Sequence, residues 1–249
     1  MSDQRDFKER PAPKVVLSIH AHPDDQEFSV AATLAKWARA GSRIISIVIT
    51  SGEAGTNDPS KDESYKPILA RIREGEQLAA NAILGIQETV FLHYPDGYLQ
   101  HTLELRRDLT RLIRKYRPDG VVCGDPTTRF FSNRYMNHPD HRAAADAACD
   151  AVFPSAGSRP IFPELLSEGY EPHEVKLVYL GSTDQPNEWV DISETLELKI
   201  NALRQHKSQL NGHFDVDKEM REWAAEEGKP VGLAAAEGFR VMVLKEDEV

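Results

Sequence analysis

The sequence predicts a single α/β domain in which a mostly parallel sheet carries helices on both faces. Continuous apolar, β-branched runs such as residues 15–19 (VVLSI) are typical of strands buried on both faces of a parallel sheet. These runs alternate with segments of helical apolar spacing, and the order strand, helix, strand is that of a βαβ crossover. The chain of 249 residues is long enough for one sizeable core. We therefore expect a Rossmann-like domain over residues 14–249, preceded by a flexible tail over residues 1–13.

The first part of the chain predicts two strands joined by a helix. The strands are residues 15–19 and 44–49, and the helical spacing that starts at Phe28 is closed by Gly41. The polar segment from residue 50 to residue 66 has no apolar period. We expect it to be a loop at the carboxyl end of the second strand, where open α/β sheets bind ligands.

The rest of the chain continues the alternation of helices and strands. The apolar patterns predict helices over 68–84 and 103–116, strands over 89–92, 120–124 and 176–180, a turn over 94–97, an irregular aromatic-rich segment over 125–137, an Ala-rich helix from 138, and a Pro-rich excursion over 153–172. Near the end we expect a helix that ends around 206–209 and a charged helix over 219–227. The apolar run 239–244 fits either a strand or a buried tail.

Composition and charge exclude several classes of partner. The net charge of −10 disfavours a nucleic acid or an anionic membrane, because either partner requires a basic surface. No apolar run is long enough to span a bilayer, and the first 13 residues lack the apolar region of a signal peptide. Cys123 and Cys149 form no CxxC pair, which favours a reducing cytoplasm. A neutral or cationic small molecule is the expected partner.

Two clusters of charged side chains indicate a metal site. Residues 20–27 (HAHPDDQE) hold two imidazoles and three carboxylates directly after the first strand, and residues 138–141 (HPDH) follow the fourth strand. Crowded carboxylates at a buried strand end require compensation, and a cation provides it. A first-row divalent metal binds imidazole and carboxylate, so His22, Asp25 and one histidine of the second cluster form a candidate ligand set. Asp24 and the other histidine match a general base and a general acid, as in metal-assisted hydrolysis.

The two clusters also carry a family resemblance. Residues 21–27 resemble the AHPDDxE signature, and residues 138–141 resemble the HPDH signature, of the LmbE-like, or PIG-L-type, zinc-dependent N-acetylglucosaminyl deacetylases. Weaker matches are the TxGExG loop at 50–55, the RxxE helix at 73–76, the PDG turn at 95–97, the HxSQ segment at 206–209 and the late EAFR at 237–240. The resemblance covers residues 14–245.

The resemblance implies a role for each matching residue. It places zinc, or another first-row divalent metal, on His22, Asp25 and His141, with Asp24 as the base. His138 would protonate the leaving amine or stabilise the oxyanion, with Asp140 orienting it. The resemblance also implies that Arg73 helps to hold the sugar. Glu53, Tyr135 and Arg129 are further expected substrate-binding residues, because the segments 53–66 and 129–137 are expected to shape the substrate pocket. Relatives of this size are often homo-oligomers, some of them hexamers.

Two positions depart from the family pattern. Some members have a tyrosine two residues before the first histidine of HPDH, where this chain has Met136, and Tyr135 is one place away. Gly238 stands where alanine is more usual. These departures leave the residue that stabilises the oxyanion open.

Less specific interpretations compete with these roles. Asp24 fits a helix cap, Asp140 fits a partner of the helix dipole, and Arg73 fits a solvated charged helix face. Glu53 fits an ordinary loop residue, and His206 fits either a residue near the site or a structural histidine. The histidines without a partner cluster are expected to be at the surface or satisfied, and they are His93, His101, His173 and His213.

The sequence is therefore compatible with three candidate functions. The leading one is removal of an acetyl group from an N-acetylated amino sugar or its conjugate. A metal-dependent phosphoesterase also uses histidine and aspartate, but generally with a second metal or more cationic contacts. A non-catalytic domain that keeps the metal and binds sugar is the third, although both the candidate base and the candidate acid are present.

Overall fold

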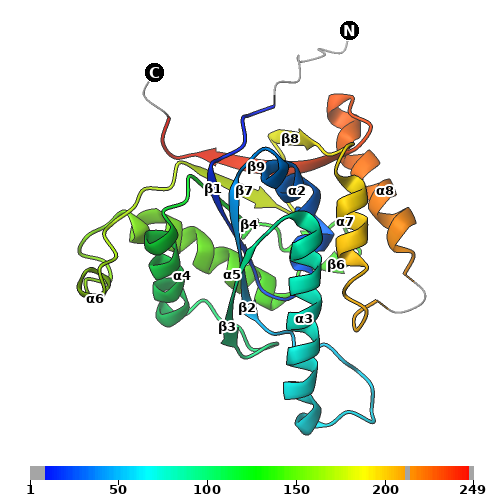
Figure 1. Cartoon of the computed structure of the whole chain (residues 1–249), viewed down its shortest axis with the longest axis horizontal. Coiled ribbons are helices and arrows are strands. Elements are labelled where there is room, and N and C mark those ends of the chain that lie inside the picture. The colour runs from blue at the N-terminus through cyan, green and yellow to red at the C-terminus, as the bar shows by residue number, and fades with distance from the viewer. Residues whose placement is uncertain (1–8, 211–213, 247–249) are drawn as a thin grey trace.

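The fold is built on a seven-stranded sheet, shown in Figure 1 for a computed structural model that describes residues 9–210 and 214–246. The strand order is β3-β2-β1-β4-β7-β9-β8. The pairs from β3 to β7 are parallel, whereas β9 is antiparallel to both β7 and β8. The strands are β1 (Val15–His20), β2 (Arg43–Thr50), β3 (Glu88–Tyr94), β4 (Gly120–Gly124), β7 (Leu177–Gly181), β8 (Glu188–Asp191) and β9 (Ala236–Val243). The predicted fold class is confirmed.

Helices cover both faces of the sheet and divide the core in two. Val16 of β1 packs with α2, α3, α7 and α8, whereas Leu17 packs on the opposite face with α4 and α5 (Figure 1). This alternation is the two-residue period of a strand. The helices are α1 (Asp25–Ser29), α2 (Ala31–Arg39), α3 (Lys66–Leu84), α4 (Leu103–Tyr116), α5 (Pro139–Asp150), α6 (Glu164–Ser167), α7 (Leu196–Leu203) and α8 (Val216–Gly228), with short turns η1 (Glu63–Tyr65), η2 (Ala151–Ala156) and η3 (Lys229–Val231).

The order of the strands creates a switch point between β1 and β4. The chain runs from β1 through β2 to β3 on one side, and from β4 to β7 on the other. Ligands of open α/β sheets bind outside the carboxyl ends of the strands at such a point. Both charged clusters follow these two strands, so the topology brings them to one edge.

The prediction of one continuous helix that starts at Phe28 is wrong. The helical segment starts earlier and is interrupted. The structure has α1 from Asp25 and then α2, separated by Val30, whose φ of −121° and ψ of 6° are not helical. The start was missed because the first residues of α1 are polar and carry no apolar period: Asp25 joins the ligand cluster, and Gln26 and Glu27 join a buried polar network.

One further segment differs from the sequence interpretation, and one open choice is settled. Residues 125–137 were expected to be irregular but contain a small antiparallel hairpin, β5 (Phe130–Phe131) with β6 (Tyr135–Met136). The final apolar run is part of strand β9, which settles the open choice in favour of a strand. By contrast, α4 and β4 have the predicted bounds.

The amino-terminal segment contacts the domain before β1 begins. Lys36 donates to Glu9 at 2.7 Å, and Arg10 pairs with Glu188 at 2.6 Å. Residues 1–8 of the predicted tail lie outside the described residues. Among the described helices, none is both long and apolar enough to cross a membrane.

Candidate functional site

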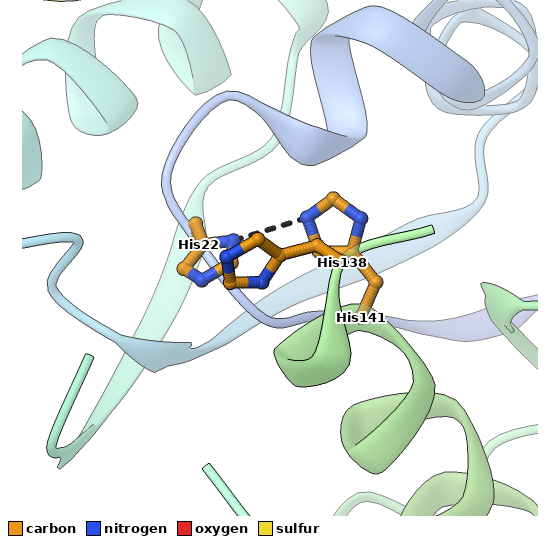
Figure 2. A group of neighbouring side chains, drawn as sticks. All are labelled: His22, His138 and His141. Atoms are coloured by element: carbon orange, nitrogen blue, oxygen red, sulfur yellow. Dashed lines mark hydrogen bonds between the residues drawn. The ribbon is translucent and has the colours of Figure 1, made fainter. Parts of the chain in front are cut away.

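The loop after β1 and the first turn of α5 bring the predicted metal ligands together. His22 and His141 are 119 residues apart in sequence, yet Nδ1 of His22 lies 3.1 Å from Nε2 of His141. The Asp25 carboxylate lies 2.9 Å from Nε2 of His141 and 3.4 Å from Nδ1 of His22. Figure 2 shows the imidazoles of His22, His138 and His141 close to one another, with the dashed line between His22 and His141. Three ligand atoms thus point to one place.

Local sequence explains how α5 presents its two histidines. Pro139 occupies the first helical position, where its missing N–H costs no hydrogen bond. His138 is the N-cap, and His141 follows three residues later on the same face. Their ring centroids are 5.3 Å apart.

The donor set fits a first-row divalent cation. Imidazole nitrogens and carboxylate oxygens are its usual ligands, and His22, His138 and His141 hold ligand atoms within 4.8 Å of one another. Burial lowers the pKa of His22, but the charge of Asp25 and hydrogen bonds to Asp140 and Asp96 outweigh it and raise that pKa to about 12. This environment strongly stabilises positive charge.

Two carboxylates lie behind His22, on the ring nitrogen that faces away from Asp25. Nε2 of His22 is 3.1 Å from Asp96 and 3.4 Å from Asp140. A metal-binding histidine usually donates its second N–H to a carboxylate, which fixes the ring and its tautomer. Asp96 was missed as a functional residue. Its signal was an acidic residue directly after the carboxyl end of a strand, within the PDG turn that matched the family pattern but was given no role.

Asp140 lies against His22 rather than His138, whereas the sequence interpretation used it to orient His138. Its Oδ2 also accepts the Gly97 N–H at 2.8 Å, and its Oδ1 is 4.0 Å from Nδ1 of His138. That nitrogen instead accepts the backbone N–H of Asp140 at 3.2 Å. His138 is therefore oriented by the helix backbone.

The Asp24 carboxylate pairs with Arg73 and lines the same cavity as the metal ligands. It holds the N-cap position of α1 with φ at 91°, but its side chain makes no capping hydrogen bond, so the helix-cap alternative is wrong. Arg73 donates to Oδ2 at 3.0 Å, and the Asp24 N–H donates to Gln77 at 3.0 Å. Burial raises the pKa of Asp24 to about 6, against the opposing effect of Arg73.

Arg73 is buried beneath the site, with 4% of its surface exposed, so the solvated-face alternative is also wrong. Its guanidinium donates to the carbonyl oxygens of Gly52 at 2.8 Å and Pro23 at 2.7 Å. Gly52 has a φ of +65°, and a Cβ there would lie 2.2 Å from the Arg73 Nη1; at Gly55 the distance would be 2.5 Å. The glycines of the loop after β2 therefore make room for this guanidinium.

Glu53 joins the same loop to the turn that carries Asp96. The Glu53 carboxylate accepts the Asp96 N–H at 2.9 Å, and the Asp96 carboxylate accepts the Ala54 N–H at 2.8 Å. These reciprocal hydrogen bonds hold Asp96 next to His22. The Glu53 carboxylate is therefore hydrogen-bonded within the protein, unlike that of an ordinary loop residue.

A cavity of about 1000 Å³ opens over the clusters. Arg73 and Tyr135 line it, and Tyr135 is 56% exposed on the β5–β6 hairpin. Glu53 and Arg129 lie outside the set of described residues that line this cavity, and Arg129 is exposed. Met136, at the position where some relatives have tyrosine, is 64% exposed.

His206 belongs to a buried polar network under α1. It is fully buried, and its Nε2 lies 3.2 Å from Glu27. Glu27 also accepts hydrogen bonds from Gln26 and from Gln77, and Gln77 in turn holds the Asp24 backbone. His206 therefore belongs to the hydrogen-bond network that holds the Asp24 backbone.

The histidines that were expected to have no role in the site lie elsewhere. His93 and His101 are partly exposed next to carboxylates, His173 contacts the Pro118 carbonyl, and His213 lies outside the described residues.

Comparisons with known proteins agree with the motifs. The family model described as "PIG-L: GlcNAc-PI de-N-acetylase" matches residues 17–152. Diacetylchitobiose deacetylase of Thermococcus kodakarensis is 34% identical over 232 residues, covering 91% of this chain and 82% of that protein. The probable N-acetyl-alpha-D-glucosaminyl L-malate deacetylase 2 of Bacillus anthracis is 28% identical over 198 residues, covering 78% and 81% respectively.

Solved structures extend the similarity to three dimensions. N,N'-diacetylchitobiose deacetylase from Pyrococcus horikoshii, complexed with its inhibitor MPG, superposes with a TM-score of 0.85 at 33% identity, covering 93% of this chain and 84% of that chain. A 4-carboxy-2-hydroxymuconate hydratase shares the fold alone, with a TM-score of 0.74 at 19% identity over 95% of this chain and 99% of that chain. The sequence and site comparisons, rather than the fold, thus decide that the chain belongs to the PIG-L, or LmbE-like, family of de-N-acetylases.

Proposed function

We propose that the protein is a metal-dependent N-deacetylase that hydrolyses the acetamide of an N-acetylglucosamine unit in a small conjugate. The observation that carries this proposal is the convergence of His22, Asp25 and His141. The Asp24 carboxylate borders the same cavity and is paired with Arg73. The relatives named above act on conjugates of this kind, which supports the substrate class.

His22, Asp25 and His141 would hold the metal, and we propose zinc. When bound, such a cation lowers the pKa of a water ligand toward about 7 and polarises the carbonyl of the substrate. The carboxylates of Asp96 and Asp140 hold the His22 ring from behind, so Nδ1 remains directed at the ligand cluster.

Asp24 acts as the general base. Arg73 fixes its carboxylate, which takes one proton from the water whose oxygen forms the new bond to the acetyl carbon. Arg73 itself is buried, so its direct effect is to position Asp24, and it also borders the cavity where the sugar would lie.

His138 assists the same reaction as a hydrogen-bond donor. Its Nδ1 accepts the Asp140 N–H, so the proton of the neutral ring is on Nε2. The Nε2–H donates to the developing oxyanion, and the proton that Asp24 took from the water passes to the amide nitrogen as the C–N bond breaks. The products are acetate and the free amine.

The direct test is release of free amine and acetate by the purified, zinc-loaded protein. We expect both products in equal amounts from N-acetylglucosamine or N,N'-diacetylchitobiose. Binding of these sugars without turnover would instead support a non-catalytic sugar-binding domain. Two metals per chain, together with hydrolysis of p-nitrophenyl phosphate, would support the phosphoesterase.

We also infer a homo-oligomer, such as a hexamer. This is supported by apolar side chains exposed on α3, where Ile68 and Leu78 are each 52% exposed. Light scattering on the purified protein measures the mass. A cytoplasmic location is proposed from the cysteine usage of the sequence.

A further inference from the structure

A buried amide lies between the β5–β6 hairpin and α5. Asn137 directly follows β6 and precedes His138, the N-cap of α5. It borders the cavity, yet only 7% of its surface is exposed. Buried polar groups in proteins are nearly always hydrogen-bonded, so the partners of Asn137 show what its side chain holds in place.

These partners determine which atom of the amide faces the metal ligands. The Asn137 side chain lies 2.8 Å from the Thr128 carbonyl oxygen on one side and 3.3 Å from Nδ1 of His141 on the other. A carbonyl oxygen only accepts hydrogen bonds, so the atom next to Thr128 is the donor Nδ2. The atom that faces His141 is therefore the acceptor Oδ1.

This orientation selects one tautomer of His141. Because Oδ1 of the amide only accepts, Nδ1 of His141 carries the hydrogen. The lone pair of the neutral ring is then on Nε2, which lies 2.9 Å from the Asp25 carboxylate and 3.1 Å from Nδ1 of His22. The opposite tautomer would direct an N–H group at the ligand cluster and could not bind a cation there.

The backbone of the hairpin segment holds the amide itself in place. The Asn137 N–H donates to the Arg129 carbonyl oxygen at 2.9 Å, and Nδ2 donates to the carbonyl oxygen of the preceding residue, Thr128. The amide cannot turn over without losing the second of these hydrogen bonds. The direction of Oδ1 is thus set by the fold.

The two imidazole ligands have different partners behind them. Nε2 of His22 faces the carboxylates of Asp96 and Asp140, whereas Nδ1 of His141 faces a neutral amide. Partners of this kind fix the ring and the tautomer of a metal-binding histidine, and their loss weakens metal binding. Asn137 does for His141 what the two carboxylates do for His22, without adding a charge.

We propose that Asn137 is a positioning residue for the metal site, which holds His141 in its Nδ1–H tautomer with Nε2 directed at the cation. This role rests on the proposed function, in which His141 is a ligand. Asn137 lies outside both motifs that carry the family resemblance most specifically, residues 21–27 and 138–141.

The test is zinc affinity, measured by competition with a chromogenic chelator. Asn137→Ala leaves Nδ1 of His141 without its acceptor, and we expect an affinity about 10–100-fold below that of the wild type. Asn187→Ala is the matched control. Asn187 also bonds on both sides, to the N–H and the carbonyl of Val241, but it lies outside the set of described residues that line the cavity. This control should keep the wild-type affinity.

Asn137→Asp separates positioning from a merely structural role. Its carboxylate keeps an acceptor for His141 but has no N–H group for the Thr128 carbonyl. We therefore expect lower stability in urea unfolding together with a zinc affinity at or above the wild-type value, whereas both quantities fall in Asn137→Ala. The visible absorption of the cobalt-substituted protein should likewise change in Asn137→Ala and be retained in Asn137→Asp.

Two results would overturn the role of Asn137. One is the same zinc affinity in Asn137→Ala and Asn187→Ala, and the other is an affinity in Asn137→Asp that falls as far as in Asn137→Ala. A wild type that binds zinc but releases no amine counts against the proposed function instead, and the comparison of affinities then still decides the role of Asn137.

Discussion

Asp24 and Asp25 are adjacent residues with opposite surroundings. Asp25 lies between two imidazoles, which lower its pKa well below the usual range despite burial, whereas Asp24 pairs with Arg73 and burial raises its pKa. The two carboxylates have different partners, Arg73 for Asp24 and the imidazoles of His22 and His141 for Asp25. These different surroundings fit the proposed roles of Asp25 as a metal ligand and Asp24 as a base.

Asp24→Asn is expected to abolish proton transfer without removing a metal ligand. General-base catalysis contributes about 10²–10⁴-fold, so kcat should fall by that factor while metal content, measured by elemental analysis, stays at the wild-type level. Asp58→Asn, in the exposed part of the loop after β2, is the matched control. Wild-type kcat in Asp24→Asn would remove Asp24 from the base role.

Asp96→Asn tests the carboxylate behind His22. The amide keeps an acceptor for the Ala54 N–H, but it no longer stabilises the ring N–H of His22 by charge. Loss of such a partner costs about 10–100-fold in metal affinity or activity. Competition with a chromogenic chelator measures the affinity, with the exposed Asp184→Asn as control. Equal affinities in the two variants would contradict this role.

At the scale of elements, the loop after β2 acts on the base through α3. Gly52→Ala is expected to displace the Arg73 guanidinium, because the new Cβ would lie 2.2 Å from it, and kcat should fall together with stability. Gly41→Ala is the matched control, since Gly41 also has a positive φ but has open space around it. It should cost about 1 kcal/mol of unfolding free energy and leave kcat unchanged.

The contrast between the two glycines is measured by urea unfolding and steady-state kinetics on the same preparations. If Gly52→Ala and Gly41→Ala lose stability equally and both keep wild-type kcat, then the loop does not position Arg73.

Apolar periodicity alone located most helices and strands, because an element such as α4 or β4 carries its whole pattern within its own residues. It failed where the pattern depends on partners. β8 is four residues long and is defined by its pairing with β9, and α1 begins with polar residues that are held by partners distant in sequence. The ligand cluster was predictable from two local motifs. Asp96 and the burial of Arg73 were not, because both depend on contacts between loops that are distant in sequence.

At the scale of the whole molecule, a metal held by His22, Asp25 and His141 would join segments from both ends of the region that the family model matches. A ligand that binds only the native state at 100 times its Kd stabilises it by about 2.7 kcal/mol. For a chain of this size, that corresponds to about 5–11 °C in Tm.

Removal of the metal with a chelator should therefore lower Tm by about 5–11 °C in differential scanning calorimetry, and added zinc should restore it. His141→Ala should start from the lower Tm and respond weakly to either treatment. A wild-type Tm that is indifferent to the chelator would show that no metal is bound in the native state.

The separation of the ligands along the chain also governs when the site forms during synthesis. His22 and Asp25 leave the ribosome early, but His141 follows only with α5, and the pair of Glu27 with His206, 179 residues apart, closes later still. Domains fold as units during translation. A nascent chain that ends before α5 carries an incomplete ligand set, so the capacity to bind metal and to hydrolyse substrate arises in a late stage of biogenesis and in one step.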